Sequence, residues 1–121
     1  MEKLTQLQQL KEVYERLLEN TKENLNGNLN RLQNDFENEF TWNAKSAYTN
    51  SVQVRLYELI IGRINEDKLD MAAAEISEFV SRIYNVRSTS TCELTNASST
   101  WKYIVYSDTL EQLKKNINWT K

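Results

Sequence analysis

The sequence predicts an α+β fold that is mostly α, with an antiparallel bundle of three to four helices followed by a C-terminal β-hairpin and a short final helix. The chain has no proline and only two glycines, Gly27 and Gly62, so the residues that most often break helices are nearly absent. Apolar residues recur at spacings of three and four through the first two thirds of the chain, which indicates amphipathic helices. The composition then changes after Val86, and this change predicts the strands.

The length of 121 residues is enough for one domain that buries a core without a metal or a disulfide. We therefore expect a single domain over residues 1–121, with a helical part at 1–85 and the β-hairpin plus C-terminal helix at 86–121. A hydrophobic content of 40% and a charged content of 26% are typical of folded soluble proteins, so disorder is not expected.

The central helix is expected between Trp42 and Ile64, the most apolar helical stretch of the chain. Its apolar residues cover much of the helix circumference, which predicts that other helices bury it. Before it, two apolar stripes predict one long helix over about residues 3–40, weak or kinked near Gly27. A helical hairpin broken at Gly27 is the alternative.

Two shorter helices complete the predicted helical set. A polar break at residues 65–68 precedes an apolar stripe that begins at Leu69, so a third helix should start there. Asp108 and Glu111 resemble a capping box, which predicts a final helix over about 109–117. Short connections between the helices favour antiparallel packing.

The β-hairpin is predicted from a stretch rich in Ser and Thr, which are poor residues for helix interiors, followed by strand-forming residues. We expect strands at Thr89–Leu94 and Ser99–Tyr106, joined by a turn at residues 95–98. Trp101 and Tyr103 would then face one side of the hairpin. Because a lone hairpin is marginal in water, it must pack on the helices or on another chain.

The residues favour a protein without catalytic activity. The absence of histidine excludes histidine bases and histidine metal ligands, and no glycine-rich loop is present to bind phosphates. Cys92 is expected to be a small buried residue of the first strand, and the spacing of Glu58, Glu75 and Glu78 does not fix a metal site. We therefore expect no enzyme, no cofactor and no metal. No leader or membrane-spanning run is evident, which favours a cytoplasmic location without membrane binding.

The functional prediction is protein–protein contact by a non-enzymatic protein. A hairpin with apolar residues on both faces cannot be covered by one layer of helices, so a partner or a second copy should cover it. We expect a homo-oligomer that acts as an inhibitor or adaptor of a host protein, as small phage and mobile-element proteins do. The predicted partner-binding residues are Trp101, Lys102, Tyr103, Tyr106, Lys114, Lys115 and Trp119.

The alternative is a small nucleic-acid-binding accessory protein. Residues 86–121 contain five basic and three acidic side chains, and Lys114, Lys115, Trp119 and Lys121 combine positive charge with an aromatic ring that could stack on a base. The surplus of two positive charges is smaller than nucleic-acid-binding surfaces usually carry. Protein contact is therefore the preferred prediction.

A further alternative comes from a resemblance in layout. A helix ending near residue 40, then Trp42 with Ala44 two places on, and then a second helix opening at Ala47 and Tyr48, is similar to the WXG-type helical hairpins exported by type VII secretion. Ala44 stands where that family has glycine. The resemblance implies that Trp42 is a structural turn residue and that the protein is a secreted partner or chaperone of an effector.

One acidic ridge remains to be interpreted. Four glutamates on the first helix recur at steps of three, four and four, so they share one outer face: Glu12, Glu15, Glu19 and Glu23. A solvated face is the preferred interpretation, and contact with a basic partner is the alternative.

Overall fold

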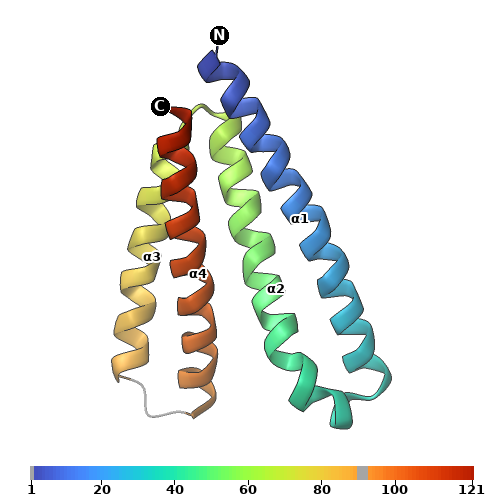
Figure 1. Ribbon diagram of the computed structural model, residues 1–121. Helices are drawn as coiled ribbons and strands as arrows, with labels where there is room; N and C mark the ends of the chain where they lie inside the picture. Colours follow the sequence, from blue (N-terminus) through green and yellow to red (C-terminus); the bar gives the residue numbers. More distant parts are fainter. Residues whose placement is uncertain (1, 90–92) are drawn as a thin grey trace.

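The computed structural model describes residues 2–89 and 93–121, and these residues form helices without any strand. Two antiparallel helical hairpins lie side by side, and both chain ends lie at the same end of the molecule (Figure 1). The four helices are α1 (Glu2–Asn34), α2 (Phe36–Asn65), α3 (Leu69–Thr89) and α4 (Glu93–Thr120). The prediction of a helical bundle is confirmed, and the predicted α+β class is wrong.

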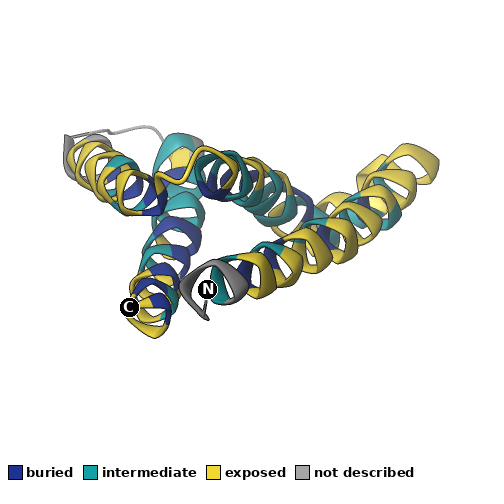
Figure 2. Cartoon of the chain, turned by 90° about the horizontal axis from the view of Figure 1, so that it is seen from above, coloured by how far each residue is buried: buried dark blue, intermediate teal, exposed yellow. Residues whose placement is uncertain are grey.

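Helices α2 and α4 form the centre of the bundle. The first hairpin is held by α1 packing on α2, the second by α3 packing on α4, and α2 contacts α4 between them. Helices α1 and α4 diverge away from the chain termini (Figure 1). The far end of the α1–α2 hairpin is consequently mostly exposed, as the burial colouring of Figure 2 shows. Apolar residues around much of α2 allow it to be buried on two sides.

One hydrophobic core joins all four helices. Its completely buried residues are Val52 and Ile60 of α2, Ala72 and Ile76 of α3, and Leu113 of α4. Tyr14 is the largest side chain that α1 buries in this core. Burial of each large apolar side chain stabilises the fold by about 1.5–3 kcal/mol. Because both hairpins contribute residues to this core, its packing holds the two hairpins together.

The boundary between the first two helices differs from the prediction. The predicted long helix over 3–40 is continuous through Gly27, as favoured, but it ends at Asn34. Asp35 has φ −152° and ψ 71°, which is not helical, and α2 begins at the next residue. The apolar spacing continues in phase from Leu32 to Phe36, so spacing alone could not reveal the turn.

The predicted C-terminal β-hairpin is wrong. The expected second strand, Ser99–Tyr106, lies inside α4, and so does the expected capping box at Asp108. Helix formation is explained by a stripe of residues four positions apart, of which the last four are buried: Trp101, Val105, Thr109, Leu113 and Ile117. A stripe with that spacing packs on α2 and α3 only as a helix, and the packing overrides the β-propensity of the aromatic residues.

The polar residues that suggested a loop are accommodated within α4. The Thr100 hydroxyl donates a hydrogen bond of 2.8 Å to the Asn96 carbonyl oxygen one turn earlier, and the Ser98 hydroxyl donates to the Thr95 carbonyl oxygen at 3.2 Å. Such bonds satisfy hydroxyl groups inside a helix. The strand role predicted for Cys92 falls on residues 90–92, which lie outside the described residues.

The connection between α2 and α3 confirms the polar break predicted at residues 65–68. Asp67 has φ 57°, in the left-handed region. The Lys68 N–H donates a hydrogen bond of 2.7 Å to the Arg63 carbonyl oxygen, and the Asp67 N–H donates to the Ile64 carbonyl oxygen at 3.0 Å. These bonds satisfy the last carbonyl groups of α2 and end the helix.

Candidate protein-binding surface

The predicted aromatic residues of α4 attach this helix to its neighbours. Tyr106 is only 8% exposed, and its ring lies edge-on to Phe79 of α3 with 6.0 Å between the ring centroids. Trp101 is half-buried and meets Tyr48 of α2 edge-on at 5.9 Å. Both side chains therefore hold α4 in the bundle, and their role in partner binding stays a prediction.

Two further predicted residues belong to the same layer. Tyr103 is half-buried, and its ring centroid lies 6.2 Å from that of Tyr84 on α3. The Lys102 ammonium nitrogen lies 5.7 Å from the centre of the Tyr106 ring, within the range of a cation–π contact. The first half of α4 thus uses its aromatic residues for contacts with α2 and α3.

The remaining predicted residues lie at the other end of α4 and stay exposed. Lys115 extends to 4.0 Å from the carboxylate of Glu111, and both side chains remain largely in water. Trp119 is 48% exposed and lines a shallow cleft together with Val13 and Arg16 of α1. Lys114 is also exposed. The structure therefore divides the seven predicted residues into four that are buried or half-buried and three that are exposed.

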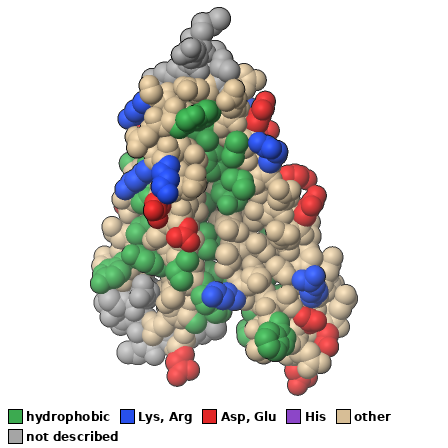
Figure 3. All heavy atoms as spheres, in the orientation of Figure 1, with side chains coloured by type: hydrophobic (Ala, Val, Ile, Leu, Met, Phe, Trp, Pro, Cys, Tyr) green, Lys and Arg blue, Asp and Glu red, His purple; other side chains and the backbone are tan. Residues whose placement is uncertain are grey.

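A second exposed aromatic surface was not predicted as a site. At the tip of the α1–α2 hairpin, Phe36 is 61% exposed, Phe40 is 47% exposed and Trp42 is 78% exposed. The ring centroids of Phe36 and Phe40 lie 5.3 Å apart, so the two rings form one pair. In Figure 3, a hydrophobic patch bordered by acidic side chains is visible at the lower right end of the molecule. We call residues 35–42 the hairpin tip.

The charge of the hairpin tip is negative. It contains three carboxylates and no basic residue, and all three lie beside the aromatic residues in the sequence: Asp35, Glu37 and Glu39. The Asn38 amide donates a hydrogen bond of 2.9 Å to the Asp35 carboxylate, and the Asn43 amide donates to the Glu39 carboxylate. Acidic residues in the first turn of α2 are also favoured by the helix dipole.

The sequence interpretation missed this surface because its aromatic residues continue a core stripe. Phe36 and Phe40 lie on the face of α2 that carries Ala47, which is buried seven positions after Phe40. Close to Ala47 the α1–α2 contact covers that face, whereas at the tip the two rings are left in water. The available signal was Asp35, a turn-forming residue within the stripe and next to Phe36.

The side chain of Trp42 points in a different direction from the phenylalanine pair. Trp42 precedes Thr49 by seven residues, about two helical turns, so both lie on one side of α2. Thr49 lines a cleft of about 250 Å³ between α1, α2 and α4. Trp42 was expected to be a turn residue in the resemblance to WXG-type hairpins, but it lies within α2, seven residues after the turn at Asp35.

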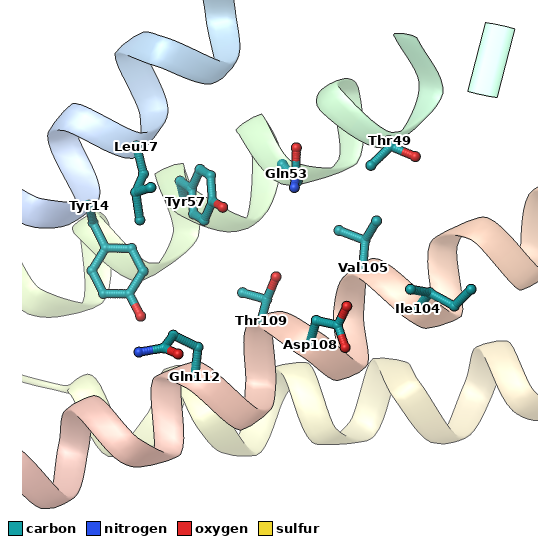
Figure 4. A pocket seen from close by; sticks show the side chains of 10 residues that line it. All are labelled: Tyr14, Leu17, Thr49, Gln53, Tyr57, Ile104, Val105, Asp108, Thr109 and Gln112. Atoms are coloured by element: carbon teal, nitrogen blue, oxygen red, sulfur yellow. The ribbon is translucent and has the colours of Figure 1, made fainter. Parts of the chain in front are cut away.

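The cleft between α1, α2 and α4 combines apolar and polar side chains (Figure 4). Tyr14 and Tyr57 contribute aromatic rings whose centroids lie 6.0 Å apart. Burial raises the pKa of both phenols above the ordinary value of 10.0, so the hydroxyl groups stay protonated at neutral pH. Asp108 supplies the carboxylate of the lining, whose ten residues are Tyr14, Leu17, Thr49, Gln53, Tyr57, Ile104, Val105, Asp108, Thr109 and Gln112.

Of the three carboxylates considered for a metal site, Glu58 is exposed on α2, and Glu75 and Glu78 have separate partners. The Arg63 guanidinium lies 2.6 Å from the Glu75 carboxylate and forms an ion pair with it. Glu78 forms an ion pair with Arg82 on the same helix. Across residues 2–89 and 93–121, no group of three or more carboxylate, thiol or imidazole side chains is placed to hold a metal ion.

The acidic ridge of α1 lies on the surface, where its four glutamates are exposed. Lys11 approaches one of them, Glu15, at 3.9 Å. Exposed pairs of this kind contribute about 0–1 kcal/mol. Their placement agrees with the preferred interpretation of a solvated face.

Comparisons with known proteins place the chain in no family. No protein-family model matches the sequence, and no curated protein or solved structure matches it either. Among the described helices, none has an apolar stretch long enough to cross a membrane.

Proposed function

We propose that this protein acts by binding another protein through the hairpin tip. The observation that carries the proposal is the exposed pair of Phe36 and Phe40, which places two aromatic rings in water at the end of the α1–α2 hairpin. Contiguous exposed apolar surface is typical of interaction sites. Aromatic residues are also enriched at the centres of protein interfaces.

The charge of the tip favours a protein partner over a nucleic acid. Asp35, Glu37 and Glu39 would repel phosphate groups, whereas a partner surface with an apolar pocket and basic rim would attract them. The protein would work as an inhibitor or adaptor that occupies a surface of its partner in the cytoplasm. Catalysis has no part in this proposal.

A nucleic-acid function would use the other end of α4. Lys114 and Lys115 are exposed there, and Trp119 offers an aromatic face to solvent. Such a function would make binding steeply dependent on salt. It is the second candidate, and the experiment below separates the two.

The test is affinity capture from cells that produce the protein, with and without nuclease, followed by mass spectrometry. The test variant is Phe36→Ser with Phe40→Ser, and the matched control is Met71→Ser, which removes a side chain 46% exposed on α3. We expect wild type and the control to capture the same protein after nuclease, and the double variant to lose most of it. Equal capture by the double variant, or capture abolished by nuclease, would contradict the proposal.

A further inference from the structure

The turn that joins α1 to α2 consists of one residue. Only Asp35 separates the two helices, and its φ of −152° and ψ of 71° depart from the helical values of about −63° and −42°. The Asp35 N–H still donates a hydrogen bond of 3.1 Å to the Arg31 carbonyl oxygen, and the Asp35 carbonyl oxygen accepts one of 2.9 Å from the Glu39 N–H. Both bonds span four residues, as in an α-helix. The difference between this hairpin and one continuous helix is therefore concentrated at Asp35.

Few features of the sequence fix this turn in its bent form. Neither glycine nor proline occurs between residues 28 and 61. Asp35 occupies the N-cap position of α2, but its side chain makes no capping hydrogen bond to that helix. It accepts a hydrogen bond from the exposed amide of Asn38 instead. Local interactions therefore favour the bent backbone only weakly.

The apolar spacing across the turn is that of a continuous helix. Six apolar residues and one asparagine follow each other at steps of four, three and four, repeated once: Leu25, Leu29, Leu32, Phe36, Phe40, Asn43 and Ala47. Such an 11-residue repeat has 3.67 residues per turn, so its members share one face of a nearly straight helix. In the hairpin Leu25 is half-buried and Ala47 is buried, whereas Phe36 and Phe40 in the middle of the stripe stay in water.

The two exposed rings lie at the centre of the antiparallel α1–α2 pairing. Its contacts include the hydrogen bond of 2.9 Å from the Asn28 amide to the Asn50 side chain and the ring contact of Tyr14 with Tyr57. Residue 39 is midway along the chain between the two asparagines, and residues 35 and 36 are midway between the two tyrosines. If two straightened chains paired through these same contacts, a two-fold axis would pass near residues 36–39. The Phe36 ring of one copy would then come close to the Phe40 ring of the other.

We propose that two copies of the chain exchange α1. In each copy Asp35 straightens, α1 and α2 become one helix over residues 2–65, and α1 packs on α2 of the other copy. The contacts between α1 and α2 are then re-formed between copies, which makes this kind of exchange a low-cost route to a dimer. The phenylalanine rings that the hairpin leaves in water become buried at the two-fold axis.

The exchanged dimer does not rest on the proposed binding of another protein. It would, however, cover the same two rings, Phe36 and Phe40, and would therefore make the hairpin tip unavailable to that protein. Self-association and partner binding would then exclude each other.

Two effects oppose the exchange and make it depend on conditions. Association costs translational and rotational freedom, so the dimer forms only as the protein concentration rises. The carboxylates of Asp35, Glu37 and Glu39 from both copies would also lie near the axis and repel one another. Salt screens this repulsion, so raising the salt concentration should lower the dimer Kd by about threefold or more.

The first test is the oligomeric state of the purified chain, measured by size-exclusion chromatography with light scattering after refolding from urea at a range of concentrations. Wild type should form a dimer as the concentration rises. Asp35→Ala should lower the dimer Kd by about tenfold, because alanine has the higher helix propensity and two hinges straighten in each dimer. Asp35→Asn removes the same charge but keeps a residue of low helix propensity, so it should lower the Kd by less than about threefold.

Crosslinking distinguishes the exchange of α1 from contact between two closed hairpins. Because the Asn28 and Asn50 side chains meet across the α1–α2 contact, cysteines at both positions lie within reach of a short bis-maleimide. The chain would also carry Cys92→Ser, so that no other thiol reacts. In a closed hairpin the reagent joins two residues of one chain, whereas in the exchanged dimer it joins two chains. The dimer fraction should therefore run as a covalent dimer on a denaturing gel, and the monomer fraction as a single chain.

Chains with only one of the two cysteines are the matched controls. Equivalent positions of the two copies would be separated by 22 residues of helix, which is about 33 Å, so the controls should give no covalent dimer. The inference is wrong if the wild-type chain stays monomeric at high concentration, or if the crosslinked dimer fraction runs as single chains. Equal effects of Asp35→Ala and Asp35→Asn would also overturn it, because the hinge would then not straighten. Capture of another protein enters none of these measurements, so their failure would leave the proposed function standing.

Discussion

The side-chain amide of Asn116 donates a hydrogen bond of 2.8 Å to the phenolic oxygen of Tyr14, although the two residues are 102 positions apart in the chain. This bond joins the first helix to the last near the end where both chain termini lie. Tyr14 is only 2% exposed and also packs beside Tyr57 of α2. The bond therefore holds α1 beside α4 at this end of the bundle.

Tyr14→Phe should destabilise the fold by about 1–2 kcal/mol, because the Asn116 amide would lose its partner in a half-buried position. Urea unfolding followed by circular dichroism would measure the free energy of unfolding. Tyr84→Phe is the matched control, since Tyr84 is 55% exposed, and it should change that free energy by less than about 0.5 kcal/mol. Equal effects of the two substitutions would contradict a structural role for the bond.

The buried phenols predict a loss of stability in alkali. Burial raises the pKa of Tyr14 above 10.0; the Asn116 hydrogen bond lowers that pKa, and neighbouring Tyr57 raises it. Because the folded state holds the proton more tightly than the unfolded state, the contribution is complete below pH about 10 and is lost as pH rises through the higher folded pKa. Urea unfolding at increasing pH should show this fall. The free energy of unfolding should fall less steeply with pH in the Tyr14→Phe variant. An identical fall in the variant would show that Tyr14 does not cause the loss of stability in alkali.

Leu113 provides a test of the core and of α4 as a helix. It is completely buried in a stripe that exists only if residues 93–120 are helical. Leu113→Ala should lower the free energy of unfolding by about 2–5 kcal/mol, since a cavity would replace the side chain. Leu29→Ala removes a leucine that is 47% exposed and should cost less than about 1 kcal/mol. Similar costs would show that α4 does not bury Leu113 in this way.

The left-handed residue Asp67 offers a stabilising substitution. A non-glycine residue at φ 57° is strained, and glycine adopts this conformation freely. Asp67→Gly should raise the free energy of unfolding by about 0.5–1 kcal/mol in thermal or urea unfolding. Asp70→Gly places glycine in the first turn of α3 and should have the opposite sign. Destabilisation by Asp67→Gly would contradict the turn geometry.

Apolar spacing was sufficient for much of the fold. It predicted the α2 segment up to Ile64, the polar break at residues 65–68 and the start of α3 at Leu69. It also favoured continuity through Gly27, where neither the backbone conformation nor nearby atoms require a glycine. These predictions succeeded because the spacing of the apolar residues matches the period of a helix over many turns.

The C-terminal third was misinterpreted because local composition was given more weight than spacing. Aromatic and β-branched residues from Trp101 to Tyr106 favour strands, but β-propensity depends strongly on context. The four-residue spacing of Val105, Thr109 and Leu113 was the signal for a helix.

The hairpin tip could not be recognised from the sequence alone. Phe36 and Phe40 have the spacing of core residues, and their exposure depends on the turn at Asp35 and on how far the second hairpin extends. Those are tertiary features, whereas spacing reports only which residues share a helix face.

The most direct test of the proposed function is site-specific photo-crosslinking in cells that produce the protein. A photoreactive phenylalanine analogue would replace Phe36 in one variant and Met71 of α3 in a control. If the hairpin tip binds another protein, crosslinking from position 36 should yield one defined heterologous adduct that is weak or absent from position 71. The absence of any heterologous adduct at position 36, or the same adduct from both positions, would contradict the proposal.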